Sequence, residues 1–146
     1  QGVSVTPIQQ IMAVSAAING GYLYKPYIVK SLNDPETNSV ILKNEPKIVR
    51  KVISDATSST VRYALESVVA RGTGHNAYIG GYRVGGKTGT AELKVSKEEK
   101  GKTLGWFDCF TVDGTGNEML IISMVENAQE NGGSHYLIKK IRTLFE

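Results

Sequence analysis

The sequence has a single cysteine, Cys109, so no disulfide can form within the chain. It has only two histidines, and no group of cysteines and histidines has the spacing of a zinc site. Cys109 lies in a segment with the residue pattern of a strand, where a lone cysteine is typically a small buried apolar side chain. Cys109 is therefore predicted to belong to a core and not to act as a nucleophile.

Long hydrophobic runs are also absent. The longest, residues 119–125, is interrupted by Ser123 and is much too short to span a bilayer.

Charge of one sign is not in large excess, because the chain has 17 lysines and arginines and 14 aspartates and glutamates. The positive charges are spread along the chain, which does not favour binding to nucleic acid. No signal peptide is visible, but the chain begins without methionine, which leaves targeting of a longer parent protein open.

What is present is the composition of an ordinary globular domain. Apolar residues make up 40% of the 146 residues and charged residues make up 21%. These values are typical of a soluble domain that is long enough to bury a core. The sequence shows no internal repeat and no low-complexity segment. Residues 1–146 are therefore expected to belong to one domain.

The first helix is predicted for residues 7–18. Thr6 can cap it, Pro7 occupies the first helical position, and Gln9 completes a capping box with Thr6. The two glycines that follow Asn19 are expected to end the helix. One face of this helix is predicted to consist of Ile8, Ile11, Met12, Ser15 and Ile18.

Two further helices are predicted from the same kinds of signal. The second begins at Ser54 or Asp55 and ends at Gly72. The third follows Ser134, which can cap it. Their apolar residues recur at helical spacing and are Val61, Ala64, Leu65, Val68 and Val69 in the second helix, and Leu137, Ile138, Ile141, Leu144 and Phe145 in the third.

Strands are predicted between and after these helices. Short turns, such as the one at residues 33–35, separate them, and the charged segment 94–102 is interpreted as a solvated loop. Strands joined by short turns, with helices grouped around them, indicate an α+β fold in which helices flank an antiparallel sheet. The predicted strands are residues 27–32, 39–43, 104–112 and 119–126.

The run Gly86-Lys87-Thr88-Gly89-Thr90-Ala91-Glu92 has two incompatible interpretations. Together with the residues before it, the segment 81–88 satisfies the P-loop pattern of nucleotide-binding proteins letter for letter. A P-loop requires a strand before the glycines and a helix that begins at the lysine. Gly89 and Thr90 are poor residues for a first helical turn, so the P-loop is not favoured. Local composition nevertheless leaves a helix over residues 91–100 open.

In the second interpretation the same run is a strand beside an active site. Lys87 then points into the site as a cation, and Thr88 offers its hydroxyl group to a substrate carboxylate. Gly89 has no side chain, so an extended substrate can lie against the backbone. This interpretation agrees with the antiparallel pattern of the residues that follow.

The residues around this run resemble one enzyme family, in the same order along the chain. Lys87-Thr88-Gly89 corresponds to the third motif of penicillin-binding proteins and serine β-lactamases. Residues 1–9 resemble the Gly-Gln-Gly and Thr-Pro-Leu-Gln signature of penicillin-binding transpeptidases, without its first glycine. The chain thus resembles the C-terminal part of the transpeptidase domain of class B penicillin-binding proteins. Further matching segments are residues 16–21, 25–29, 68–74, 81–92, 106–107 and 125–127.

The resemblance implies roles for four consecutive residues. Lys87 would bind the carboxylate of a substrate or β-lactam and support proton transfer. The hydroxyl groups of Thr88 and Thr90 would hold the same carboxylate, and Gly89 would keep the groove open. The backbone N–H of Thr90 would be one of two hydrogen-bond donors to the oxyanion. No metal ion and no organic cofactor are implied.

Two departures from the family pattern are visible in this sequence. The family's nucleophile lies in Ser-x-x-Lys, where the lysine activates the serine. No serine of this chain is followed by lysine three residues later. Ser31-Leu32-Asn33 fits the family's Ser-x-Asn motif, but it follows the Gly-Gln-Gly region instead of preceding it, and we interpret it as a coincidence. The chain alone is therefore predicted not to be acylated by β-lactams.

The resemblance also implies the activity and surroundings of the parent protein. We expect a D,D-transpeptidase that cross-links peptidoglycan stem peptides through a serine acyl-enzyme, anchored in the bacterial cytoplasmic membrane with this region outside. The expected partners are stem peptides, β-lactams and the N-terminal half of the same domain. An oligomeric or domain-swapped assembly would also cover an incomplete core. Three alternatives stay open, namely a β-lactam sensor or β-lactamase-like relative, a non-catalytic scaffold module, and the P-loop.

Overall fold

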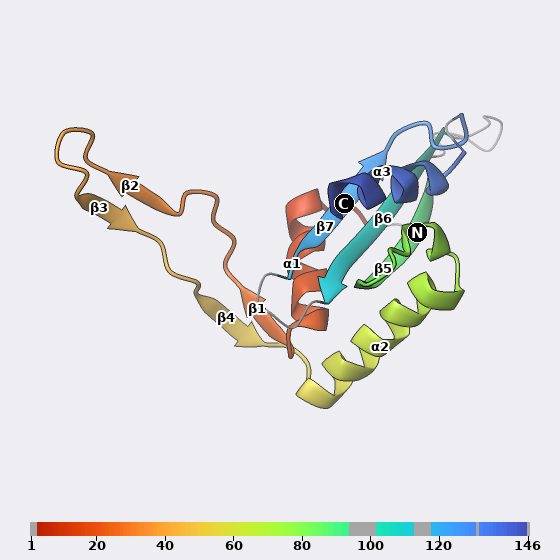
Figure 1. The fold of residues 1–146 in the computed structure, drawn as a ribbon, viewed down its shortest axis with the longest axis horizontal. Coiled ribbons are helices and arrows are strands. Elements are labelled where there is room, and N and C mark those ends of the chain that lie inside the picture. The colour runs from red at the N-terminus through yellow and green to blue at the C-terminus, as the bar shows by residue number, and fades with distance from the viewer. Residues whose placement is uncertain (1–2, 94–101, 113–117, 131, 146) are drawn as a thin grey trace.

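The computed structural model describes residues 3–93, 102–112, 118–130 and 132–145, and Figure 1 shows a body of helices and a sheet from which a long arm projects. In chain order the elements are α1 (Pro7–Ile18), β1 (Tyr22–Tyr24), β2 (Ser31–Asn33), β3 (Val40–Lys43), β4 (Ile48–Lys51), α2 (Asp55–Arg71), the 3-10 helix η1 (His75–Ala77), β5 (Arg83–Leu93), β6 (Lys102–Val112), β7 (Leu120–Val125) and α3 (His135–Phe145).

The body is built on a three-stranded antiparallel sheet in the order β5-β6-β7. Within the described residues β5 pairs only with β6, so it is an edge strand. Its register with β6 places Lys87 opposite Asp108, Thr88 opposite Phe107 and Gly89 opposite Trp106. The expected fold class, an antiparallel sheet flanked by helices, is confirmed.

Helices lie on both faces of this sheet. Successive residues of a strand point to opposite faces, and Asp108 receives a hydrogen bond from Gln10 of α1, whereas Phe107 packs in the core with residues of α3. α1 and α3 therefore cover opposite faces, with α2 alongside β5 (Figure 1). The core on the α3 side consists of Val69, Ala77, Val84, Phe107, Cys109, Leu137, Ile138 and Ile141.

The glycine pair before Lys87 is required by packing. A Cβ atom on Gly85 would lie 2.3 Å from Cζ of Phe110, well inside van der Waals contact. A Cβ atom on Gly86 would lie 2.8 Å from the backbone oxygen of Asp108. The two glycines let the aromatic side chains of β6 lie across β5.

The P-loop interpretation is wrong. Lys87 and Thr88 lie in the middle of the eleven-residue strand β5, and residues 91–93 continue that strand. No helix therefore begins at the lysine, and the backbone N–H groups that a helix N-terminus would direct at a phosphate are missing. The remainder of the alternative helix, residues 94–100, lies outside the described residues.

The three predicted helices are confirmed, together with the N-terminal caps of the first two. The side chain of Thr6 accepts a hydrogen bond from the N–H of Gln9, whose side chain in turn accepts from the N–H of Thr6. Ser54 caps α2, and Gly72 follows its last residue. The predicted apolar faces are wrong at three positions, because Ile8 of α1 is 47% exposed, Leu144 of α3 is 66% exposed and Ala64 of α2 is exposed. Leu144 lies in the last turn of the helix, beyond the residues that reach the sheet.

The strand predictions are only partly correct. Residues 39–43 and 119–126 contain β3 and β7, and residues 104–112 cover β6 except for its first two residues. Lys102 begins β6 although it was predicted to lie in a loop, and the rest of that predicted loop, residues 94–101, lies outside the described residues. Residues 27–32 overlap a strand only at Ser31 and Leu32. The strands β1 and β4 were not predicted at all. They pair with each other, and β2 pairs with β3, so two short antiparallel ribbons form the arm in Figure 1. Such three- or four-residue strands leave too little alternation for a sequence pattern to detect.

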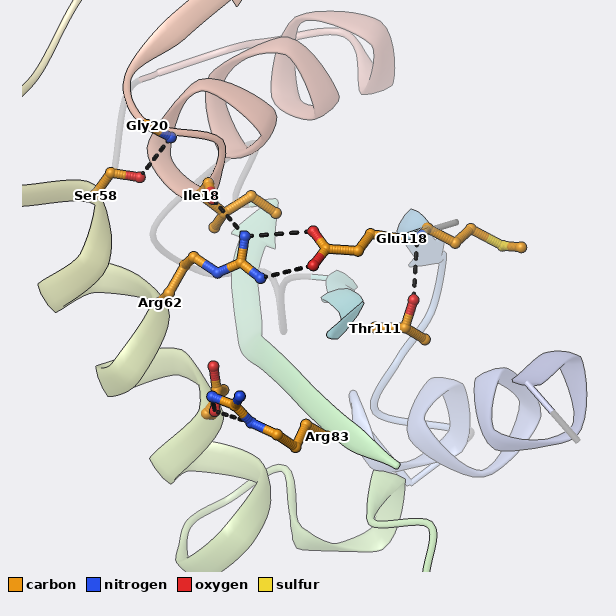
Figure 2. A network of polar contacts seen from close by, with 9 residues as sticks. Ile18, Gly20, Ser58, Arg62, Arg83, Thr111 and Glu118 are labelled. Carbon is orange, nitrogen blue, oxygen red and sulfur yellow. Dashed lines mark hydrogen bonds and ion pairs between the residues drawn. The ribbon is translucent and has the colours of Figure 1, made fainter. Parts of the chain in front are cut away.

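A polar network joins α1, α2 and the sheet (Figure 2). The guanidinium group of Arg62 donates to the backbone oxygen of Ile18 at 2.9 Å and to both carboxylate oxygens of Glu118 at 3.1 and 3.3 Å. Ser58 is 1% exposed, and its hydroxyl accepts from the N–H of Gly20 and donates to the backbone oxygen of Ala17, both at 2.9 Å. Ser58 thus pairs backbone groups that the end of α1 leaves open.

Replacing Ser58 by alanine is expected to lower the free energy of unfolding by about 1–3 kcal/mol, because two backbone groups lose their partner. The matched control is Ser59→Ala at the adjacent, exposed position of α2, where the change should stay within about 0.5 kcal/mol. Urea-induced unfolding measures both. Equal effects at the two positions would contradict the role given to the Ser58 hydroxyl.

Candidate active site

An open groove of about 730 Å³ runs along the edge strand β5. It receives residues from β5, from β6, from α1 and from the segment that precedes α1. Its lining consists of Val3, Ser4, Val5, Gln10, Lys87, Thr88, Gly89, Thr90, Ala91, Glu92, Leu104, Trp106 and Asp108. Residues 3–5 belong to the segment 1–9 that resembles the transpeptidase signature, and they border the same space as the Lys-Thr-Gly strand more than 80 residues later in the sequence.

All four residues predicted for the site lie in this groove, at consecutive positions of β5. Strand geometry places Lys87 and Gly89 on one face and Thr88 and Thr90 on the other. Both pairs still border the groove, because β5 has a free edge. Lys87 and Thr90 are exposed, while Thr88 and Gly89 are half-buried.

The polar contacts of the motif stay close to β5. Lys87 Nζ donates a hydrogen bond to the backbone oxygen of Thr88 at 2.6 Å. The hydroxyl of Thr88 lies 3.2 Å from that of Thr73, in the turn after α2. Gly72 ends α2, and Thr73 reaches the motif strand.

Asp108 is a groove residue that the sequence did not reveal. It is 8% exposed, it lies opposite Lys87 in the register of β5 and β6, and its Oδ2 accepts a hydrogen bond from Nε2 of Gln10 at 2.8 Å. Burial raises the pKa of the Asp108 carboxyl above its ordinary value, and the hydrogen bond from Gln10 and the charge of Lys87 oppose that rise. A signal in the sequence could have identified Asp108. It follows Trp106 by two residues in a predicted strand, so the two side chains lie on the same face.

Cys109 is confirmed as a buried residue of the core. Its side chain is fully buried on the α3 side of the sheet. Burial, together with the nearby charge of Asp108, raises the pKa of the thiol to about 12, so the thiolate that a cysteine nucleophile needs is not formed at neutral pH. In the part of the chain that the structure describes, no three His, Cys, Asp or Glu residues are grouped to hold a metal ion.

The Ser-x-Asn match lies far from the motif strand in the fold. Ser31, Leu32 and Asn33 form the strand β2 of the arm, not the turn that the sequence predicted for Asn33. None of the three lines the groove. Trp106, by contrast, lines the groove and is the cross-strand partner of Gly89.

The groove has the features of a site for an extended, anionic ligand. The edge of β5 exposes backbone groups that can pair with an extended chain, as in strand addition. A lysine and two threonine hydroxyls stand beside that edge and can bind a carboxylate. A glycine between the threonines lets a ligand approach the backbone closely.

The similarity to known proteins agrees with this geometry. The family model of the penicillin binding protein transpeptidase domain matches residues 1–146. Stage V sporulation protein D of Bacillus subtilis (strain 168) is 64% identical over 92 residues, which are 63% of this chain and 14% of that protein. Penicillin-binding protein 3 of the same strain is 32% identical over 147 residues, covering 99% of this chain and 20% of that protein.

The fold is also found in a solved structure. The crystal structure of the D,D-transpeptidase domain of a peptidoglycan glycosyltransferase from Eggerthella lenta is similar with a TM-score of 0.75 and 27% identity. The similarity covers 97% of this chain and 31% of that one.

The chain spans a fifth or less of the length of the two curated relatives. Among its described residues, none of the helices combines the length and apolar character needed to cross a bilayer. The chain belongs to the penicillin-binding protein transpeptidase family, as a fragment of the transpeptidase domain.

Proposed function

We propose that the full-length protein is a D,D-transpeptidase that cross-links peptidoglycan, and that this chain is the C-terminal portion of its transpeptidase domain. A serine outside this chain would attack the terminal D-Ala-D-Ala bond of a stem peptide. The terminal D-alanine would leave, and an amine of a neighbouring stem would take the acyl group from the serine. The observation that carries the proposal is the Lys-Thr-Gly-Thr sequence on an edge strand that borders an open groove.

Each residue of the motif has a role in this proposal. Lys87 binds the carboxylate of the stem peptide or of a β-lactam and supports proton transfer to and from the serine. The hydroxyls of Thr88 and Thr90 hold the same carboxylate. Gly89 lets the ligand lie along β5, and the N–H of Thr90 stabilises the oxyanion of the tetrahedral intermediate. The open edge of β5 and the grouping of these residues at one groove support these roles.

The N-terminal half of the same domain would supply the nucleophile and close the groove. Apolar side chains beside the groove are exposed, among them Val3 at 83%, Val5 at 45% and Ile8 at 47%. Exposed apolar surface of this kind marks an interaction site. We therefore assign it to the N-terminal half, with an oligomeric or domain-swapped arrangement as the alternative occupant.

The proposed substrates and location follow from the activity. The protein would act on stem peptides and be acylated by β-lactams, and the name of its relative penicillin-binding protein 3 supports the binding of penicillin. Its substrate lies outside the cytoplasm, so the domain would face that side of the bacterial membrane, with its anchor elsewhere in the protein. No metal or cofactor takes part in the proposed reaction.

Treatment with fluorescent penicillin tests the proposal. The full-length protein is expected to form a stable covalent adduct that maps to a serine outside these 146 residues, whereas the 146-residue chain alone is expected to form none. Intact mass spectrometry followed by peptide mapping measures both. An adduct on the isolated chain, for example on the groove residue Ser4, would contradict the assignment of the nucleophile.

The remaining alternatives give different results in the same experiment. Rapid hydrolysis of the adduct would indicate a β-lactamase-like relative, because a transpeptidase remains acylated. A stable adduct without peptide cross-linking would indicate a β-lactam sensor. No adduct on the full-length protein would overturn the proposed activity in favour of a scaffold module.

A further inference from the structure

A buried carboxylate in the groove has half of its hydrogen-bonding capacity unused. Oδ2 of Asp108 accepts from Gln10. Oδ1 is also buried, and the residues that the structure describes supply no hydrogen-bond partner for it. A buried carboxylate oxygen without a hydrogen-bond donor destabilises the fold. The presence of Asp108 at a position that is only 8% exposed therefore indicates a role other than folding.

The position of Asp108 supplies that reason. It is the cross-strand partner of Lys87, and directly opposed residues of an antiparallel pair carry their side chains on the same face, about 4.5–5.5 Å apart at Cβ. Both side chains line the groove. The positive charge of Lys87 opposes the rise that burial causes in the pKa of the Asp108 carboxyl, as expected for opposite charges on one face of the sheet.

Gln10 limits how Asp108 can use its free oxygen. The amide of Gln10 comes from α1 and holds Oδ2, so the carboxyl group cannot rotate freely. Lys87 Nζ is bound to the backbone oxygen of Thr88. A lysine side chain has several rotatable bonds, and its ammonium has three donors. It can therefore exchange one backbone acceptor for a nearby carboxylate.

We propose that Asp108 is a positioning residue for Lys87, in which the unpartnered Oδ1 holds the Lys87 ammonium in the groove while Gln10 holds the carboxylate. The carboxylate directs the ammonium away from the Thr88 backbone oxygen toward the ligand. This proposal rests on the function proposed above for Lys87. It adds two residues, Gln10 and Asp108, which the motif does not contain.

The test is Asp108→Asn in the full-length protein, because it removes the negative charge with almost no change in shape. The matched control is Asp34→Asn, at a half-buried position in a turn of the arm that is not part of the groove, where asparagine can still accept the turn hydrogen bonds. The first measurement is the rate at which acetic anhydride acetylates Lys87, determined by peptide mass spectrometry. Exposed lysines such as Lys30 serve as internal standards.

Acetylation of Lys87 is expected to rise about tenfold in Asp108→Asn, because an ammonium held by a carboxylate reacts slowly. It should stay unchanged in Asp34→Asn. The first-order rate of acylation by penicillin is expected to fall about tenfold, while the melting temperature stays the same or rises, since a desolvated charge is removed.

Two outcomes would overturn the proposal. One is unchanged acetylation of Lys87 in Asp108→Asn. The other is a fall in melting temperature that accompanies the slower acylation, because Asp108 would then act only through folding. If the wild-type protein is not acylated at all, the proposed transpeptidase function fails, but the acetylation rates still decide whether Asp108 positions Lys87.

Discussion

Replacing Lys87 by methionine in the full-length protein is expected to slow acylation by penicillin by roughly two to three orders of magnitude, the loss typical of one electrostatic group aimed at developing charge. Methionine keeps the unbranched shape of the side chain and removes the cation. Lys87 is exposed on the edge strand and lines the groove, so its removal should leave folding intact. Stopped-flow or gel-based labelling with fluorescent penicillin measures the second-order rate constant.

The control for this prediction is Lys30→Met. Lys30 is an exposed lysine between β1 and β2, in the arm, and is not part of the groove. Its replacement changes the net charge by the same amount and should leave the acylation rate within about twofold, because long-range surface electrostatics are screened. Equal rates for the wild type and Lys87→Met would show that the motif lysine has no part in the reaction.

The largest expected effect on stability comes from Phe107→Ala. Phe107 is 0% exposed, lies in the central strand β6 and packs in the core with residues of α2 and α3. Removing a buried phenylalanine leaves a cavity that the surrounding side chains fill only in part. The free energy of unfolding should therefore fall by about 3–5 kcal/mol.

Urea-induced unfolding of the protein measures this loss. The control is Leu144→Ala, since Leu144 is 66% exposed in α3, and its replacement should change the free energy of unfolding by less than about 0.5 kcal/mol. A similar loss at both positions would contradict the assignment of the core to the α3 side of the sheet. The rate at which penicillin acylates Phe107→Ala, measured under conditions where this variant is folded, should be much closer to the wild-type rate than the rate for Lys87→Met.

The helices could be predicted from the sequence because their signals are local. The capping box joins Thr6 to Gln9, three residues away, and Ser54 likewise caps α2 through Thr57. The motif strand could be predicted for a related reason. Gly89 directly after Lys87 and Thr88 disfavours a helix, so the sequence favoured the strand over the P-loop, although only the structure excluded the P-loop.

The arm could not be predicted in the same way. β1 and β4 are three and four residues long, and they pair across more than 20 residues of intervening chain. A two-stranded ribbon has one neighbour for each strand and buries little surface. Its residues therefore carry no alternation of apolar and polar side chains, and their pairing depends on the path of the chain.

The sequence by itself determined the helices, the family and the four motif residues, because each depends on neighbours within a few positions or on a matching order of short segments. Only the tertiary structure decided that Gln10 and Asp108, 98 residues apart, meet at the groove. It also decided that Thr73 reaches Thr88 and that Asp108 opposes Lys87. The physical reason is that strand register and helix packing bring these groups together, and neither produces a recognisable pattern in the sequence around the residues that meet.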